Sequence, residues 1–205
     1  KLPDNRFLRI YKNILDIWDT SLSKYGGKII YKREKFIKRI SIISSEIQKQ
    51  ITNNKENLIL EYSPNIKVEK SILEQQEALY KKTKESFNND LRLRTTTRGP
   101  HKDDFSFIVN NVNMRSFGSQ GQQRTCALSL KLAELKLIKE ETGENPVLLL
   151  DDVMSELDLE RQEFLLETLK ENQVFITSTS IEEQLKKIFQ KSNTYYVKKG
   201  EISEK

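Results

Sequence analysis

The chain has 205 residues, of which 36% are hydrophobic and 32% charged, a balance typical of soluble globular proteins with one or two domains. No stretch approaches the ~20 consecutive apolar residues of a membrane helix, and the first residues lack the apolar core of a secretory signal. The single cysteine, Cys126, cannot form an internal disulfide, and the single histidine, His101, excludes sites built from several histidines. We therefore expect a cytoplasmic protein without membrane contact, in which Cys126 is buried and reduced.

The formal net charge of +5 is unevenly distributed along the chain. Residues 1–100 hold 21 basic and 12 acidic side chains, whereas residues 101–205 hold 14 basic and 18 acidic ones. This asymmetry indicates a basic interaction surface in the first half, joined to an acidic second half that is a candidate for metal binding.

Residues 1–92 are predicted to form a mainly α-helical domain. Apolar residues recur there at three- and four-residue steps, the period of helices with one buried stripe. The predicted elements are helices at residues 7–25, 29–51 and 69–89 and a short strand at residues 58–62. Because Gly26 and Gly27 separate the first two stripes, we expect these helices to be joined by a glycine turn and packed as an antiparallel pair.

Residues 93–205 are predicted to form an α/β domain, so that the whole chain is an α/β protein with a helical second lobe. The predicted strands lie at residues 105–109, 112–114, 147–150, 174–177 and 195–197, and the helices at residues 119–143, 159–170 and 181–189. The continuous apolar run at 147–150 is typical of a fully buried strand in a parallel sheet.

Two adjacent carboxylates, Asp151 and Asp152, follow the apolar run directly. Ligands of open α/β sheets bind beyond the carboxyl ends of the strands, which would place both acids at the crevice. One of them is a candidate ligand of Mg²⁺, and the other is a candidate for polarising an attacking water. A plain exit from a strand into a loop is the alternative.

Two further segments are candidates for the same crevice. Ser119, Gly121 and their neighbours open a long helix, where a serine cap, a glycine and free N–H groups form an anion site at the positive helix end. Ser155 and Asp158 stand between the acids and the next helix. The alternative for both segments is simple helix capping.

The order of these segments resembles ABC-type ATPases. Residues 119–122, 148–152 and 155–158 are similar to the signature motif, the Walker B strand and the D-loop of that superfamily. Residues 99–104, 117–125, 131–135 and 148–158 together resemble the RecF family of bacterial DNA replication and repair proteins, over about residues 92–180. The resemblance implies a partial ABC-type ATPase lobe corresponding to the C-terminal portion of that family.

The resemblance implies roles for the acids and for the residue after the next strand. Asp151 takes the Mg²⁺-associated Walker B position, and Asp152 takes the place of the acid that activates water. The switch position, often histidine in ABC proteins, falls at Ser178, a departure that favours slow hydrolysis of ATP.

The resemblance further implies an ATP-dependent homodimer. The signature residues would contact the γ-phosphate of ATP held by the opposite subunit: Ser119, Gln120, Gly121 and Gln122. Ser155 and Asp158 would lie at the same dimer interface. The implied partners are gapped or single-stranded DNA, RecR and RecO, with RecA loaded downstream in gap repair and the SOS response.

No glycine-rich phosphate-binding loop of the form G-x-x-x-x-G-K-[ST] occurs within these 205 residues. The family carries that loop near its N-terminus, ahead of the segments that match here. We therefore expect that this chain alone neither binds ATP tightly nor hydrolyses it, and that the complete protein is a weak DNA-dependent ATPase.

A cluster of basic residues on the second predicted helix is a candidate DNA contact: Lys28, Lys32, Arg33, Lys35, Lys38 and Arg39. Neutralisation of phosphates is the functional interpretation, and a solvated lysine-rich face is the alternative. A second function also stays open, that of an ATPase-inactive helical adaptor that binds DNA or protein. The role of His101 is open between a ligand contact and a hydrogen-bonded turn residue.

Overall fold

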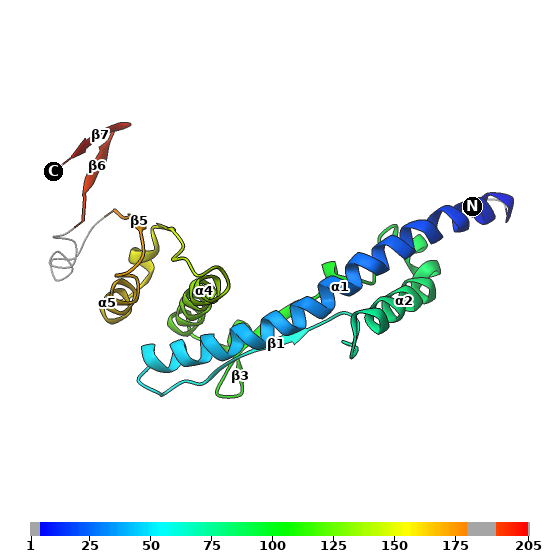
Figure 1. Cartoon of the computed structure of the whole chain (residues 1–205), viewed down its shortest axis with the longest axis horizontal. Coiled ribbons are helices and arrows are strands. Elements are labelled where there is room, and N and C mark those ends of the chain that lie inside the picture. Colours follow the sequence, from blue (N-terminus) through cyan, green and yellow to red (C-terminus); the bar gives the residue numbers. More distant parts are fainter. Residues whose placement is uncertain (1–4, 180–191, 205) are drawn as a thin grey trace.

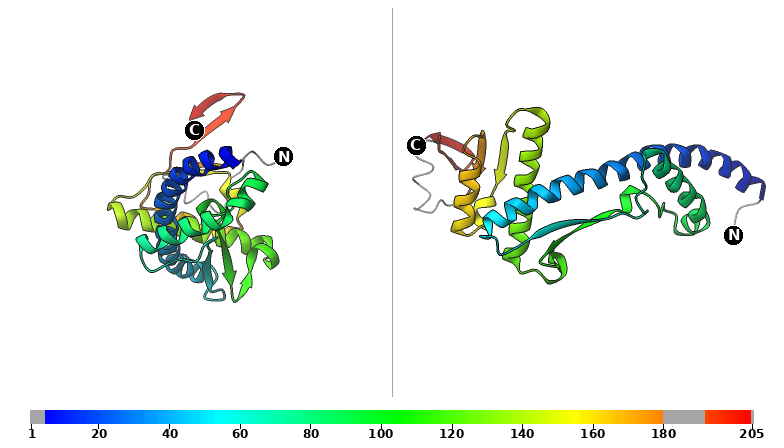
Figure 2. Two further views of the ribbon diagram at one scale, coloured as in Figure 1. Left: turned by 90° about the vertical axis from the view of Figure 1, so that its right-hand side faces the viewer. Right: turned by 60° about the horizontal axis from the view of Figure 1, so that its bottom comes forward.

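The computed structural model describes residues 5–179 and 192–204. Its longest element is a helix of 47 residues, α1 (Asn5–Ile51), against which much of the remaining chain packs (Figure 1). At the usual rise of an α-helix, α1 is about 70 Å long. A second long helix, α2 (Ile72–Leu93), lies along the N-terminal half of α1 (Figures 1 and 2). The two helices that we expected from residues 7–51 are therefore a single helix, and the predicted antiparallel pair is wrong.

The two glycines in the middle of α1 provide close contact with α2 instead of a turn. A Cβ atom on Gly26 would lie 2.7 Å from Cδ2 of Leu79, and one on Gly27 would lie 2.9 Å from Cα of Gln76. The Gln76 side chain also donates a hydrogen bond of 2.8 Å to the carbonyl of Lys24. Because Gly26 and Gly27 have no side chains, the backbones of α1 and α2 can approach closely. This contact explains why two glycines occur in the middle of a helix, where glycine is otherwise unfavourable.

An antiparallel sheet lies beside the C-terminal half of α1 and has the order β1 (Leu58–Ser63), β2 (Asp104–Val109) and β3 (Val112–Asn113). In the register of β1 and β2, Leu58 pairs with Val109. The connection between these two strands contains helix α2 and the short 3₁₀ helix η1 (Pro100–Lys102). Asn110 and Asn111 both have positive φ, as a tight hairpin turn requires. The strands predicted at 58–62 and 105–109 are confirmed, and the strand predicted at 112–114 is confirmed for residues 112–113, because Met114 begins the next helix.

The remaining helices and strands follow in alternation: α3 (Met114–Phe117), α4 (Gln120–Thr142), β4 (Leu148–Asp151), η2 (Val153–Glu156), α5 (Leu159–Thr168) and β5 (Val174–Thr177). Strands β4 and β5 are parallel, and Asp151 pairs with Thr177 at the carboxyl end of both. This confirms the α/β class, and α4 and α5 confirm two predicted helices.

The last described residues form a separate hairpin of β6 (Tyr195–Lys198) and β7 (Glu201–Glu204). Strand β6 confirms the prediction at 195–197, whereas β7 was not expected. The helix predicted at 181–189 lies outside the described residues.

The prediction of a fully buried strand at 147–150 is wrong. Leu148 is only 9% exposed, but Leu149 is 78% exposed, so β4 buries one face. Parallel strands are buried on both faces only where helices cover both sides of a sheet. Among the described residues the second face, with Leu149 and Phe175, has no such cover.

Two clusters of buried side chains hold the molecule together. The larger one includes Ile47 of α1, Leu58 of β1, Cys126 of α4 and Leu165 of α5, and confirms that Cys126 is buried. The smaller one lies between α1 and α2 around Leu79. The larger core takes residues from both sides of the predicted boundary at 92/93, and the division into two domains stays a prediction.

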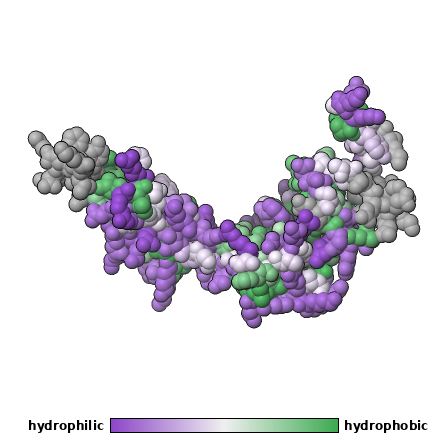
Figure 3. Space-filling model, turned by 180° about the vertical axis from the view of Figure 1, so that it is seen from behind, coloured by the Kyte–Doolittle hydropathy of each residue, from purple (hydrophilic) through white to green (hydrophobic). Residues whose placement is uncertain are grey.

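The surface is largely polar. Hydrophilic side chains cover most of the face seen in Figure 3, with apolar patches between them. No helix within the described residues has both the length and the hydropathy needed to cross a membrane.

Candidate functional site

The segment Ser119–Gln122, here called the signature turn, forms the N-terminal end of α4. Ser119 is the N-cap, and its Oγ accepts a hydrogen bond of 3.3 Å from the backbone N–H of Gln122. Gln122 reciprocates, since its Oε1 accepts from the backbone N–H of Ser119 at 3.1 Å. The capping role that the sequence offered as an alternative is confirmed, and it orders the turn.

Gly121, in the first turn of α4, faces open space. A Cβ atom placed there would have no heavy atom within 4 Å. The first N–H groups of a helix lack partners within the helix, and they favour an anion. Because nothing inside the subunit requires a glycine at this position, Gly121 leaves room for a group that approaches from outside.

Asp151 and Asp152 lie at the carboxyl end of β4, as predicted, and both are exposed. Thr177 connects them, because its hydroxyl donates to Asp151 Oδ1 at 2.5 Å and accepts from the backbone N–H of Asp152 at 3.1 Å. Asp152 has a φ of 50°, a left-handed conformation that is uncommon outside glycine and clusters at functional sites.

The carboxylates at the end of β4 fit a magnesium ion by their chemistry. Mg²⁺ in phosphate-binding sites needs only one or two protein carboxylates, since phosphate oxygens and water complete the shell. Asp151 is exposed at the strand end and held in place by Thr177. No group of three or more His, Cys, Asp or Glu residues suited to hold a metal occurs in the described parts of the chain.

The predicted D-loop, residues 155–158, is fixed by hydrogen bonds at both ends. Ser155 Oγ donates to the carbonyl of Asp152 at 2.8 Å, and Asp158 caps α5 by accepting from the backbone N–H of Arg161 at 3.0 Å. The buried Gln162 side chain donates to the carbonyls of Met154 at 2.6 Å and Leu157 at 2.9 Å. Ser155 therefore contacts the backbone of Asp152, and Asp158 is the helix cap.

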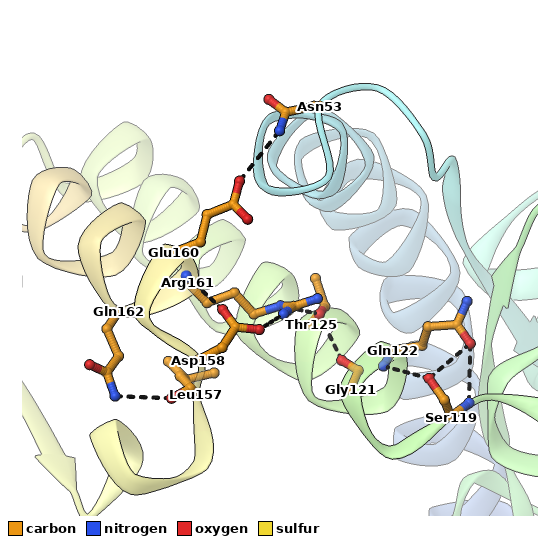
Figure 4. Close-up of polar contacts among 10 residues, drawn as sticks. All are labelled: Asn53, Ser119, Gly121, Gln122, Thr125, Leu157, Asp158, Glu160, Arg161 and Gln162. Atoms are coloured by element: carbon orange, nitrogen blue, oxygen red, sulfur yellow. Dashed lines mark hydrogen bonds and ion pairs between the residues drawn. The ribbon is translucent and has the colours of Figure 1, made fainter.

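Arg161 joins the D-loop to the helix of the signature turn (Figure 4). Its guanidinium pairs with Asp158 and donates through Nε to Thr125 Oγ1 at 2.7 Å. Thr125 is fully buried and donates in turn to the carbonyl of Gly121 at 2.7 Å. The two segments are thus one connected unit, whereas no hydrogen bond or ion pair links Asp151 or Asp152 to the signature turn among the described residues.

Three of the six basic candidates on α1 form ion pairs with acidic residues of the same chain. Arg33 donates to the carbonyl of Pro100 at 2.5 Å and to Asp103 at 3.2 Å, and the Asp103 side chain is only 2% exposed. Arg39 forms ion pairs with Glu140 and Glu141 of α4, at 3.0 and 2.8 Å. Lys38 pairs with Glu34 one turn earlier on α1.

The other three basic candidates are exposed on α1: Lys28, Lys32 and Lys35. Lys35 places its ammonium 4.5 Å from the centre of the Tyr31 ring. Within the described residues none of the three has an acidic partner. All six are exposed, so the structure separates the predicted basic cluster into three residues paired with acids and three that have no acidic partner among the described residues.

Two smaller predictions have different outcomes. His101 Nε2 lies 2.8 Å from the carbonyl of Thr96, which favours the turn interpretation over a ligand contact. Ser178 is exposed directly after β5, beside Thr177, and its role as the switch residue stays a prediction.

Three residues at the site escaped the sequence analysis: Thr125, Arg161 and Thr177. Thr177 had a signal, because it ends a strand predicted to be parallel to the one that ends at Asp151, and Thr125 ends the segment 117–125 that resembles RecF, although no role was assigned to it. Thr125 and Arg161 lie on different helices, and no local pattern relates them.

Comparison with known proteins connects this geometry to a family. The chain is 46% identical to the DNA replication and repair protein RecF of Alkaliphilus oremlandii over 191 residues, which are 92% of this chain and 52% of that protein. It is 43% identical to the protein of the same name from Lactococcus lactis, over 96% of this chain and 52% of that protein. This chain is homologous to half of RecF. No family model matches it.

Solved structures agree with the sequence comparison. A structure of the recombination mediator protein RecF-ATPrS in the RecFOR pathway matches with a TM-score of 0.81 and 36% identity, over 94% of this chain and 51% of that one. A RecF-ATP structure matches equally well, over 50% of its length. The chain thus has the fold of the part of RecF that it matches, and it spans about half the length of those RecF proteins.

Proposed function

We propose that this chain supplies the signature turn, the Walker B acids and the D-loop of a RecF-type DNA repair and recombination protein. The observation that carries the proposal is the homology to RecF together with the ordered, outward-facing turn at Ser119 and Gly121. Because one matched structure is a RecF-ATP structure, ATP is the nucleotide that we propose for this site.

The proposed roles follow from where the side chains lie. Ser119 and the N–H groups of Gln120 and Gly121 are proposed to contact the γ-phosphate of ATP bound to a second subunit, which the open space at Gly121 accommodates. Ser155 and Asp158 are proposed to lie at that dimer interface, and Asp158 is connected to α4 through Arg161.

Asp151 is proposed to hold Mg²⁺ and Asp152 to orient the attacking water. The metal would supply charge neutralisation of the phosphates. Thr177 holds both acids, since it fixes the carboxylate of one and the backbone of the other. Ser178 follows Thr177 directly and is proposed to be the switch residue that responds to the bound phosphate.

A chimaera tests the nucleotide role. In it, this chain replaces the segment that it matches in the RecF of Alkaliphilus oremlandii. We expect Mg·ATP to convert the chimaera from monomer to dimer in light scattering. Ser119→Arg should preserve ATP binding and abolish dimerisation, and Asp152→Asn should preserve dimerisation and slow hydrolysis at least 10-fold. Dimers that form equally well with Ser119→Arg would refute the signature role.

DNA binding is proposed for the exposed face of α1 with Lys28, Lys32 and Lys35. The triple replacement of these lysines by glutamate should weaken binding of gapped and single-stranded DNA at least 10-fold and flatten its dependence on salt, measured by fluorescence anisotropy. Arg33→Gln is the matched control, because Arg33 contacts Asp103 and should affect stability instead. Unchanged affinity in the triple variant would place the DNA contact elsewhere.

The partners and the location complete the proposal. RecO and RecR are the proposed protein partners, since the matched structures belong to the RecFOR pathway, and RecA loading is the proposed outcome in the cytoplasm. A chimaera that binds DNA but neither binds ATP nor dimerises would favour the adaptor function instead.

A further inference from the structure

A chain of hydrogen bonds runs from the C-terminal end of α1 to the signature turn. Ser129 Oγ of α4 donates to Gln48 Oε1 of α1 at 2.7 Å, and both residues are fully buried. Gln48 Nε2 donates to Glu56 Oε2 at 2.7 Å. The other carboxylate oxygen of Glu56 accepts from Gln122 Nε2 at 3.0 Å, so that Glu56 joins α1 to the signature turn.

The Gln122 side chain is almost fully occupied by contacts inside the subunit. Its Oε1 accepts from both the backbone N–H and the hydroxyl of Ser119, at 3.1 and 3.2 Å, and Nε2 donates to Glu56 (Figure 4 shows the Ser119 contacts). A primary amide has one oxygen with two lone pairs and two N–H donors. Three of these four capacities are thus used between Ser119 and Glu56.

The position of Glu56 is itself determined by the end of α1. The backbone N–H of Glu56 donates to Thr52 Oγ1 at 3.2 Å, and Thr52 Oγ1 donates to the carbonyl of Gln48 at 2.7 Å. The negative charge of Glu56 also contributes to raising the pKa of Cys126 on α4, after the larger effect of burial. The carboxylate is therefore held beside the first turns of α4, where a helix favours negative charge.

We infer that Glu56 is a positioning residue for the signature turn, and that Gln122 is a brace inside the subunit instead of a phosphate contact. Glu56 holds the Gln122 amide in the one orientation in which Oε1 accepts from Ser119, and this fixes the outward face of the turn. The contact with nucleotide rests on the proposed function, whereas the bracing does not. Because Glu56 is anchored to α1, the helix with the exposed lysines also positions the signature turn.

An exchange of donor and acceptor tests the brace in the 205-residue chain itself. Glu56→Gln brings an amide group against two amide donors, and Gln122→Glu brings a second carboxylate against Glu56, so each single variant should loosen the turn. The double variant Glu56→Gln with Gln122→Glu restores the pairing with its polarity reversed, and a glutamate at 122 still accepts from the Ser119 N–H.

Hydrogen–deuterium exchange provides the readout. Each single variant should accelerate exchange of the Ser119 and Gln122 amides, the two that are hydrogen-bonded within the turn, at least 10-fold and leave the middle of α4 unchanged, and the double variant should restore slow exchange. Glu61→Ala, which removes an exposed acid from β1, is the control and should change nothing. Equal exchange of the turn in the parent and both single variants would overturn the inference.

The chimaera separates this inference from the proposed function. If the parent chimaera dimerises with ATP, Glu56→Gln should leave ATP binding unchanged and raise the dimer dissociation constant about 10-fold, and no rise would overturn the positioning role. If the parent chimaera does not dimerise, the proposed function fails, and the exchange experiment still decides whether Glu56 braces the turn.

Discussion

At the scale of single residues, hydroxyl groups connect the segments that we propose to meet nucleotide. Thr125 is fully buried on α4 and takes a hydrogen bond from Arg161 while giving one to Gly121. The Thr177 hydroxyl likewise connects the two acids, because it donates to the Asp151 carboxylate and accepts from the backbone N–H of Asp152. The site is therefore held by residues that have no catalytic chemistry of their own and escape any search for reactive side chains.

Cys126 yields a prediction about pH. Burial, assisted by the charge of Glu56, raises the pKa of this thiol from its ordinary value of 9.0 to about 12. Above pH 9 the unfolded chain loses the thiol proton while the folded chain keeps it, so the free energy of unfolding should fall as pH rises from 9 to 11, by no more than about 1.4 kcal/mol per pH unit. Urea unfolding at each pH measures this slope.

Cys126→Ala isolates the contribution of the thiol, because the variant lacks the ionising group. Its stability should fall less steeply than that of the parent between pH 9 and 11. Tyr62 contributes a background slope in both proteins, since burial and its hydrogen bond to Asp103 raise the pKa of the phenol. Parallel slopes in the two proteins would contradict the assignment to Cys126.

At the scale of elements, α1 shows how packing overrides local signals. Two adjacent glycines favour a turn, and each costs roughly 1 kcal/mol in a helix. In the structure, Leu79 and Gln76 of α2 pack directly against these two glycines. The distant partner that decides their conformation lies about fifty residues further along the chain, beyond the reach of a local pattern.

Gly27→Ala tests the close contact of these helices. Alanine has the higher helix propensity, but its Cβ would lie 2.8–2.9 Å from the side chain and backbone of Gln76. We expect a loss of about 1–3 kcal/mol in the free energy of unfolding, measured with urea. Gly121→Ala is the matched control in α4, where the Cβ meets open space, and should cause no loss. Equal effects of the two variants would show that α2 does not constrain α1.

At the scale of the whole molecule, apolar side chains are exposed to solvent on the parallel sheet and on α1 in the described part of the chain. Leu149 and Phe175 are 78% and 56% exposed on one face of the parallel sheet. Trp18, Tyr25 and Phe36 recur along one face of α1 and are 68%, 62% and 49% exposed. Exposed apolar patches of this kind mark interaction sites, and the RecF relatives have about as much chain again beyond the matched half.

Binding of an apolar dye tests whether that additional chain covers these faces. The 205-residue chain should bind anilinonaphthalene sulfonate strongly, whereas the RecF chimaera should show several-fold lower fluorescence per molecule. Leu149→Ser and Phe175→Ser together should lower the fluorescence of the chain and leave that of the chimaera unchanged. Equal fluorescence of chain and chimaera would mean that the faces stay bare.

The sequence by itself determined the α/β class, most strands, the caps at Ser119 and Asp158, and the order of signature, Walker B and D-loop segments that resembles RecF. These features depend on local periodicity, on turn residues and on motif spacing, which neighbouring residues encode. The tertiary structure alone decided that α1 is continuous, that Arg33 and Arg39 pair with acids while, among the described residues, Lys28, Lys32 and Lys35 do not, and that hydrogen bonds connect Glu56 with Gln122 and Arg161 with Thr125. Each of these depends on a contact between residues far apart in the chain, which only packing brings together.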